Sequence, residues 1–189
     1  MAEDTDQQLV DRVLAGKKNA FDLLVLRYQH RVAALISRFV HDPQEVEDVC
    51  QEAFIKAYRA LALFRGDSAF YTWLYRIAVN TAKNYLVSKS RRPPASDVEI
   101  DQAEISEVGM VLREIDNPEG ALATEKLKQA ITAAIAELPE DLRTAFTLRE
   151  FSGLSYEDIT EIMDCPVGTV RSRIFRAREA IDSKIRDLL

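Results

Sequence analysis

The stretch LSYEDITEIMDCPVGTVRSRIFRARE, residues 154–179, predicts two short helices separated by a break. Ser155 is a favoured helix cap, and isoleucines follow it at helical spacing. Pro166 then interrupts the pattern, because proline disfavours helical geometry at the residue before it. We therefore predict a first helix that begins at Ser155 and ends near Met163, followed by a break over 164–168.

The second helix of this stretch is rich in arginine, and we expect Thr169 to cap it. Successive helical residues turn by about 100°, so residues on one face can be read from the sequence. The predicted apolar stripe comprises Val170, Ile174, Ala177 and Ile181. The opposite side carries Ser172, Phe175, Arg176 and Glu179, with Arg171, Arg173 and Arg178 on its flanks.

This polar side has the chemistry of a helix that lies in the major groove of DNA. Guanidinium groups can bind phosphates or guanine, and hydroxyl and aromatic groups can contact base edges. The order of capped helix, break and basic helix predicts a helix-turn-helix. A solvated arginine-rich helix is the alternative, and it explains the charge but not the two helices around a break.

The net charge of −6 is unevenly distributed along the 189 residues. Residues 1–92 hold 14 Lys and Arg against 11 Asp and Glu, whereas residues 93–125 hold 1 against 9. The acidic segment begins after an Arg-Pro-Pro sequence and lacks sustained helical periodicity. We predict two small domains, 1–92 and 126–189, joined by an acidic linker over 93–125. A solvated tether and a specific role fit this linker equally well.

Composition argues against several classes of protein. No leading signal segment and no apolar run of about 18 residues is present, so we expect a cytoplasmic protein. The two cysteines and two histidines lack metal-ligand spacing, and no phosphate loop or nucleophile elbow occurs. We expect no enzyme activity, metal, cofactor or small-molecule ligand.

The amino-terminal part predicts helices over 5–15 and 19–40 and a third opened by Asp42 and Pro43. Along the third helix, the outward side comprises Asp48, Glu52, Ile55 and Arg59. An exposed Ile55 framed by carboxylates is unusual, and acidic groups repel phosphate. A protein-docking surface and a plain solvated face remain equally open here.

A fourth helix mixes aromatic and basic residues between positions 64 and 85. Its predicted core side comprises Phe70, Leu74, Ile77, Thr81 and Tyr85. A neighbouring polar ridge comprises Arg76, Asn80 and Lys83, with Trp73 at its border. Together with the preceding loop, this ridge could hold unstacked bases, since cations bind the backbone and aromatic rings stack. Packing in the core is the alternative for Phe70 and Tyr85, whereas we predict function for Trp73, Asn80 and Lys83.

Three segments resemble those of the extracytoplasmic-function sigma factors, above all the envelope-stress sigma-E type: DVCQEAFIKAYRAL (48–61), FRGDSAFYTWLYRIAVNTAKNYL (64–86) and the 154–179 stretch. The similarity spans nearly the whole chain and weakens across the acidic middle. It implies an all-α fold of two helical domains, the region 2 and region 4 modules. It also implies a dissociable subunit of bacterial RNA polymerase that directs the core enzyme to promoters and opens the duplex.

The resemblance assigns roles to three groups of residues. The family's polymerase-binding helix matches Asp48, Gln51 and Glu52, to which the ridge pattern adds Ile55. The loop that receives a flipped base of the −10 element matches Phe64, Arg65, Gly66, Asp67, Ser68 and Ala69, with Trp73, Arg76, Asn80 and Lys83 on the following helix. The −35 helix matches Arg171, Ser172, Phe175 and Arg176, to which we add Thr169 and Arg178.

The partners so implied are bacterial RNA polymerase core, promoter DNA in duplex and single-stranded form, and an anti-sigma protein, which in this family is often membrane-anchored. The acidic middle would correspond to the connector that threads the RNA-exit path of the polymerase. Two other functions remain: a stand-alone helix-turn-helix regulator that binds an operator as a dimer, and a helical adaptor. The aromatic loop and the acidic ridge favour the sigma factor, because neither alternative needs both.

Overall fold

A computed structural model describes residues 4–91, 127 and 129–186 of the chain. The described residues form helices and no strand, which confirms the predicted all-α class. They belong to two compact units, 1–98 with 157–165 and 99–156 with 166–189, and each unit is described by itself. The predicted acidic linker, 93–125, lies outside the described residues.

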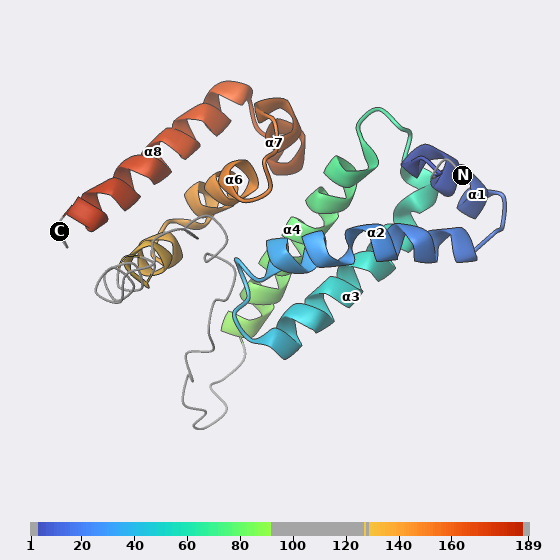
Figure 1. Ribbon diagram of the computed structural model, residues 1–189, viewed down its shortest axis with the longest axis horizontal. Helices are drawn as coiled ribbons and strands as arrows, with labels where there is room; N and C mark the ends of the chain where they lie inside the picture. Colours follow the sequence, from blue (N-terminus) through green and yellow to red (C-terminus); the bar gives the residue numbers. More distant parts are fainter. Residues whose placement is uncertain (1–3, 92–126, 128, 187–189) are drawn as a thin grey trace, which may run out of the picture. The chain divides into compact units, whose positions relative to one another are not determined.

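The first unit contains the amino-terminal helices of the chain (Figure 1). In chain order they are α1 (Asp6–Leu14), α2 (Asn19–Ile36), α3 (Pro43–Ala60), the 3₁₀ helix η1 (Leu61–Leu63) and α4 (Phe70–Ser90). Helix α2 contacts α1, α3 and α4, so it lies at the centre of this group. Residues 157–163 of α7 (Tyr156–Met163) are also part of this unit.

Two helix starts in the first unit carry caps, at the start of α1 and at the predicted Asp42-Pro43 opening of α3. Thr5 and Gln8 form a reciprocal capping box at the start of α1. Asp42 accepts hydrogen bonds from the backbone of Gln44 and Glu45, and Pro43 occupies the first turn of α3. Helix α2 ends at Ile36 rather than near position 40, because the chain turns away after Ser37.

The core of the first unit comes from the apolar faces of these helices. Leu9, Leu24, Val49 and Leu74 have at most 1% of their surface exposed and come from α1, α2, α3 and α4 in turn. Two members of the predicted α4 core side are less deeply placed, since Ile77 and Tyr85 are half-buried. Burial of such side chains is the main source of stability for helices of this length.

The second unit contains a helical stretch over 129–136, α6 (Glu140–Glu150) and α8 (Val167–Arg186). Helix α8 packs against α6. One core cluster comprises Ala134, Leu138, Leu142, Ala177 and Ile181, with Ile135, Phe146 and Ile185 packed against it. The predicted stripe Val170, Ile174, Ala177 and Ile181 is buried throughout, which confirms the face assignment on α8.

The start of α8 corrects one prediction. Thr169 does not cap this helix, because α8 already begins at Val167. The Pro166 carbonyl accepts hydrogen bonds from the N–H groups of Thr169 (2.9 Å) and Val170 (3.1 Å), so Pro166 occupies the position that we expected for Thr169. The reversal of the chain comes earlier, at Asp164, whose φ is 50°. Aspartate is among the few non-glycine residues that adopt such angles readily.

Within the described ranges, no helix is both long enough and apolar enough to cross a membrane.

Candidate functional sites

The predicted docking ridge lies on the solvent side of α3. Asp48, Gln51, Glu52 and Ile55 are all exposed, whereas Val49, Ala53 and Ala57 on the opposite side are buried. Ile55 keeps 45% of its surface accessible although it is a large aliphatic residue. Lys56 pairs with Glu52 at 2.8 Å, four residues apart on the same helix. The ridge therefore combines an exposed apolar residue with carboxylates, as the sequence pattern predicted.

A groove beside the ridge was not predicted from the sequence. It has a volume of about 500 Å³ and is lined by Phe21, Gln51, Phe54, Ile55, Tyr58 and Arg59. The ring of Phe21, from α2, meets that of Tyr58 edge to face, with centroids 5.0 Å apart. Tyr58 remains 40% exposed. The lining is mainly apolar and aromatic, which is the composition of the energetic centre of protein interfaces. Only tertiary packing brings α2 to this side of α3, so helical periodicity could not reveal it.

The loop over 64–69 connects η1 to α4. Arg65, Gly66, Asp67 and Ala69 are exposed, and Phe64 and Ser68 are half-buried. Arg65 and Asp67 form an ion pair across the loop at 3.1 Å. Gly66 has a φ of 76°, a conformation that side-chain-bearing residues adopt only with strain. The loop thus has a defined turn with its polar groups in solvent.

An aromatic cluster supports both ends of this loop. The Phe64 ring lies 5.7 Å from that of Phe70 and 5.2 Å from that of Trp73, and Phe70 lies 5.7 Å from Trp73. Phe64 is the first residue of the loop and Phe70 is the first residue of α4. Trp73 is half-buried in this cluster, so one part of its ring packs while another part remains accessible.

The predicted polar ridge follows α4 away from the loop. Arg76 and Asn80 are exposed and Lys83 is half-buried. Because a helix rises 1.5 Å per residue, Asn80 lies about 10 Å along the helix from Trp73 on nearly the same face. The loop, Trp73 and the ridge therefore form one surface that is long enough for several unstacked nucleotides.

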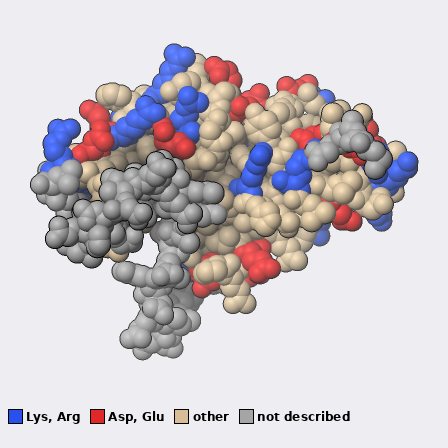
Figure 2. All heavy atoms as spheres, viewed as in Figure 1, with Lys and Arg blue, Asp and Glu red and all other residues tan. Residues whose placement is uncertain are grey.

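The basic side of α8 is exposed as predicted. Arg171, Ser172, Phe175, Arg176 and Arg178 face solvent, and Thr169 is half-buried. Phe175 keeps 61% of its surface accessible, although it is aromatic and far from the helix ends. Such exposure fits a residue that packs on a partner rather than in the core. Figure 2 shows Lys and Arg side chains over α8 standing next to acidic ones.

Two arginines of the second unit are paired with acids of α6. Arg173 contacts Asp141 and Arg178 contacts Glu150, each at 2.5 Å. The hydrogen bond to Glu150, together with its negative charge, raises the pKa of Arg178. Arg178 thus remains cationic, but it faces an acidic neighbour as well as solvent. The sequence pattern had placed it simply on the flank of the basic side.

Tyr156 adds an aromatic contact that the sequence analysis did not single out. The guanidinium carbon of Arg149 lies 4.8 Å from the Tyr156 ring centroid, and that of Arg171 lies 5.5 Å from it. Arg149 also donates a hydrogen bond to the Leu154 carbonyl at 2.7 Å. Cation–π contacts of this kind limit the positions that the two guanidinium groups can adopt. These contacts join residues of α6, α7 and α8, so the periodicity of a single helix gave no sign of them.

The described residues contain no group of three or more His, Cys, Asp and Glu side chains placed to hold a metal ion. Cys50 and Cys165 are thiols that form no disulfide, and both are half-buried. The pKa of the Cys50 thiol is raised mainly by burial, and the negative charge of Glu47 raises it further. A raised thiol pKa lowers the fraction of reactive thiolate at neutral pH.

Comparison with known proteins gives two family matches and several close relatives. The profile described as "Sigma-70 region 2" matches residues 24–92, and that described as "Sigma-70, region 4" matches residues 128–181. The RNA polymerase sigma-H factor of Pseudomonas aeruginosa is 64% identical over all of this chain and 98% of its own length. The ECF RNA polymerase sigma-E factor of Escherichia coli is 66% identical over 98% of this chain and 96% of its own length.

A solved structure shares the fold. It is the sigma factor RpoE in complex with the anti-sigma factor NepR from Bartonella quintana, with a TM-score of 0.63. The likeness covers 88% of this chain and 96% of that one at 22% sequence identity, so it bears on the fold alone.

Proposed function

The chain belongs to the sigma-70 family, in its extracytoplasmic-function group, and is an alternative sigma factor of RNA polymerase; from this premise we propose how its surfaces divide the work of initiation. The α3 ridge binds the polymerase core, the 64–69 loop with α4 reads and opens the −10 element, and α8 reads the −35 element. The promoters it serves belong to genes for envelope or extracytoplasmic stress. This division follows the predicted domains 1–92 and 126–189.

The observation that carries the proposal is the exposure of the base-facing side of α8. Phe175 and Arg176 stand in solvent while Ile174 and Ala177, their neighbours in sequence, are buried. Such a helix can insert its exposed side into the major groove while its buried side packs against the rest of the unit. Arginine can then bind guanine in a bidentate manner, and Phe175 can contact a thymine methyl group.

The −10 assignment rests on the loop and its aromatic support. A base that leaves the duplex loses stacking at a cost of a few kcal/mol, which a protein pocket must recover. Phe64 and Trp73 are only half-buried and stand where they can stack on such a base. Asn80 offers both a donor and an acceptor to a base edge. Opening is thus driven by binding, and we propose no covalent chemistry for the chain.

The polymerase assignment rests on α3 and its groove. The acidic ridge repels DNA, so it suits a protein partner, and the groove can receive apolar side chains of that partner. We further propose that an anti-sigma protein covers these surfaces when the factor is idle, since the Bartonella sigma factor of the same fold is found bound to its anti-sigma factor NepR. The factor acts in the cytoplasm, where the polymerase and promoter DNA are found.

Transcription with purified core polymerase on a library of promoter sequences tests the proposal. The expected result is RNA that starts at defined sites preceded by a common −35 and −10 pair, obtained only when the chain is added. The chain alone is expected to bind the same duplexes poorly. Absence of defined starts, or tight operator binding by the chain alone, contradicts the proposal.

A further inference from the structure

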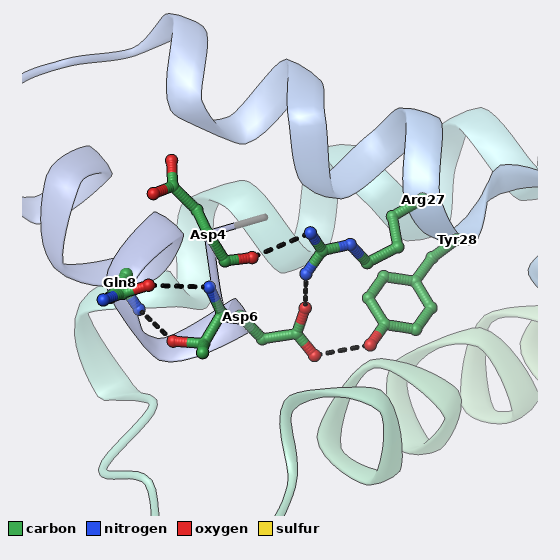
Figure 3. A network of polar contacts seen from close by, with 6 residues as sticks. Asp4, Asp6, Gln8, Arg27 and Tyr28 are labelled. Carbon is green, nitrogen blue, oxygen red and sulfur yellow. Dashed lines mark hydrogen bonds and ion pairs between the residues drawn. The ribbon is translucent and has the colours of Figure 1, made fainter. Parts of the chain in front are cut away.

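The start of α1 is tied to α2 by a polar network that no surface described above uses (Figure 3). The Asp6 carboxylate accepts hydrogen bonds from Arg27 Nη1 and from the Tyr28 hydroxyl, both at 2.5 Å. Arg27 Nη2 donates to the Asp4 carbonyl at 2.8 Å. Burial, then the bond to Asp6, raises the pKa of Tyr28, so its hydroxyl remains a donor at neutral pH. The network therefore fixes where α1 begins.

Tyr28 connects this network to the base-reading loop. Tyr28 is only 5% exposed, and its ring lies 5.7 Å from the ring of Phe70. Phe70 in turn contacts Phe64 and Trp73, which flank the loop. Aromatic pairs at these separations stabilise the packing beyond the effect of their buried area. A continuous series of contacts thus leads from Asp6 to both ends of the loop.

A second contact reaches the middle of the loop directly. A Cβ atom at Gly66 would lie 3.3 Å from Oε1 of Gln7, so the exposed side chain of Gln7 lies close to the turn of the loop. The Nε2 atom of Gln7 donates to Asp11 Oδ1 at 2.9 Å, which holds the amide in this orientation. Helix α1 also contacts η1, the element just before the loop. The loop is therefore supported at its ends and at its turn.

We infer that α1 is the positioning support of the base-reading loop, and that Asp6 and Gln7 set how well the loop discriminates among bases without touching DNA. The inference rests on the proposed function, because it supposes that the loop receives a flipped base. A pocket selects a base only when its walls are held within a fraction of an ångström. Loss of the support leaves the loop in several conformations, which lowers discrimination more than it lowers overall binding.

The test compares α1 variants in the full-length chain assembled with core polymerase. Gln7→Ala removes the amide beside Gly66, and because Gln7 is exposed, folding is expected to persist. Asp6→Ala removes the acceptor of the hydrogen bonds from Arg27 and Tyr28. Asp6→Asn retains polar contacts, so it is expected to retain more of the wild-type base preference than Asp6→Ala. Lys89→Ala is the matched control, because it removes the ion pair with Glu45 at 2.6 Å, which joins α3 to the far end of α4 from the loop.

The readout is binding to single-stranded −10 oligonucleotides that differ only at the flipped position. Gln7→Ala and Asp6→Ala are expected to reduce the preference for the best base by about threefold to tenfold, which is part of the discrimination that one base contributes. Association with core polymerase and binding of −35 duplex are expected to match the wild type. An unchanged preference in Gln7→Ala and in folded Asp6→Ala, or an equal loss in Lys89→Ala, overturns the inference.

A loop variant separates this outcome from failure of the proposed function. Arg65→Ala combined with Asp67→Ala removes the loop's own ion pair and alters two exposed side chains. If this double variant changes the base preference while the α1 variants do not, only the role of α1 is wrong. If the double variant also leaves the preference unchanged, the loop is not the base reader and the proposed −10 site is wrong.

Discussion

The two proposed nucleic-acid sites hold their contact residues in different ways. On α8, the contact residues project from a regular helix whose opposite stripe is buried, so the helix itself fixes their spacing. On the 64–69 loop, the backbone is not helical, and its shape depends on the aromatic cluster and on α1. One site is positioned by local hydrogen bonding and the other by long-range packing.

This difference matches the two forms of DNA that the sites are proposed to bind. Duplex DNA presents its base edges at fixed spacing in a groove that admits a helix, so a rigid rod of side chains suffices. An unstacked base must instead be enclosed on several sides, which a loop can do once its walls are fixed. The comparison predicts that distant substitutions affect the loop site more than they affect α8.

The largest effect is expected when the chain loses its affinity for core polymerase, because neither proposed DNA-binding site can then act in transcription. Asp48→Arg places a cation on the docking ridge, and like charges or unpaired charges at an interface cost several kcal/mol. Association with core polymerase is expected to fall by at least about tenfold, as measured by titration of labelled core, with −35 duplex binding by the chain unchanged. Glu47→Arg is the control, because it makes a similar exchange at an exposed position beside the ridge. Undiminished association of Asp48→Arg contradicts the docking assignment.

The next effect concerns α8 alone. Arg176→Ala is expected to weaken −35 binding by roughly 1–3 kcal/mol and to relax the preference at one base pair, as for an arginine that binds a base edge. Competition among duplexes with single substitutions measures both changes. Arg186→Ala, an exposed arginine in the last turn of α8, is the control and is expected to leave base preference intact. An Arg176→Ala protein with normal base preference shows that Arg176 does not read sequence.

A smaller effect is expected at the proposed −10 site, which comprises the 64–69 loop and α4. Asn80→Ala is expected to slow promoter opening by a few-fold while initial duplex binding stays normal, since its amide meets a base edge only after strand separation. Fluorescence of 2-aminopurine in the −10 element follows opening. Asn84→Ala, which removes an exposed amide one turn further along α4, is the control. Equal loss of duplex binding and opening means that Asn80 does not act on the open strand.

Sequence periodicity predicted those features that a single helix determines. The buried stripe of α8 and the exposed ridge of α3 follow from 100° steps, and both are confirmed. The opening of α3 by Asp42 and Pro43 depends on local hydrogen bonding and was predicted in the same way. The predicted start of α8 was wrong, because Thr169 and Pro166 are both acceptable near a helix start and only the backbone geometry decides between them.

Features made by two elements could not be predicted in this way. The groove joins Phe21 to Tyr58, and the loop support joins Gln7 to Gly66, so each depends on how helices pack. The pairing of Arg178 with Glu150 is of the same kind. Such contacts leave no period in the sequence of either partner.

That last ion pair gives the smallest and most specific prediction. Arg178 is about half-exposed and faces Glu150, so the carboxylate both holds the arginine and repels a phosphate that approaches it. Glu150→Gln releases the guanidinium, and exposed ion pairs contribute little to stability, so folding is expected to be unaffected. Affinity for duplex DNA is expected to rise about twofold at low salt, with a steeper salt dependence by about 0.9 in log–log slope if one phosphate contact is gained.

Asp141→Asn is the matched control on α6 for this prediction. Its partner Arg173 is only 22% exposed and stands back from the groove-facing side, so the salt slope is expected to stay unchanged. A flat response of both variants means that Arg178 contacts no phosphate, and the proposed −35 surface of α8 then consists of Thr169, Arg171, Ser172, Phe175 and Arg176.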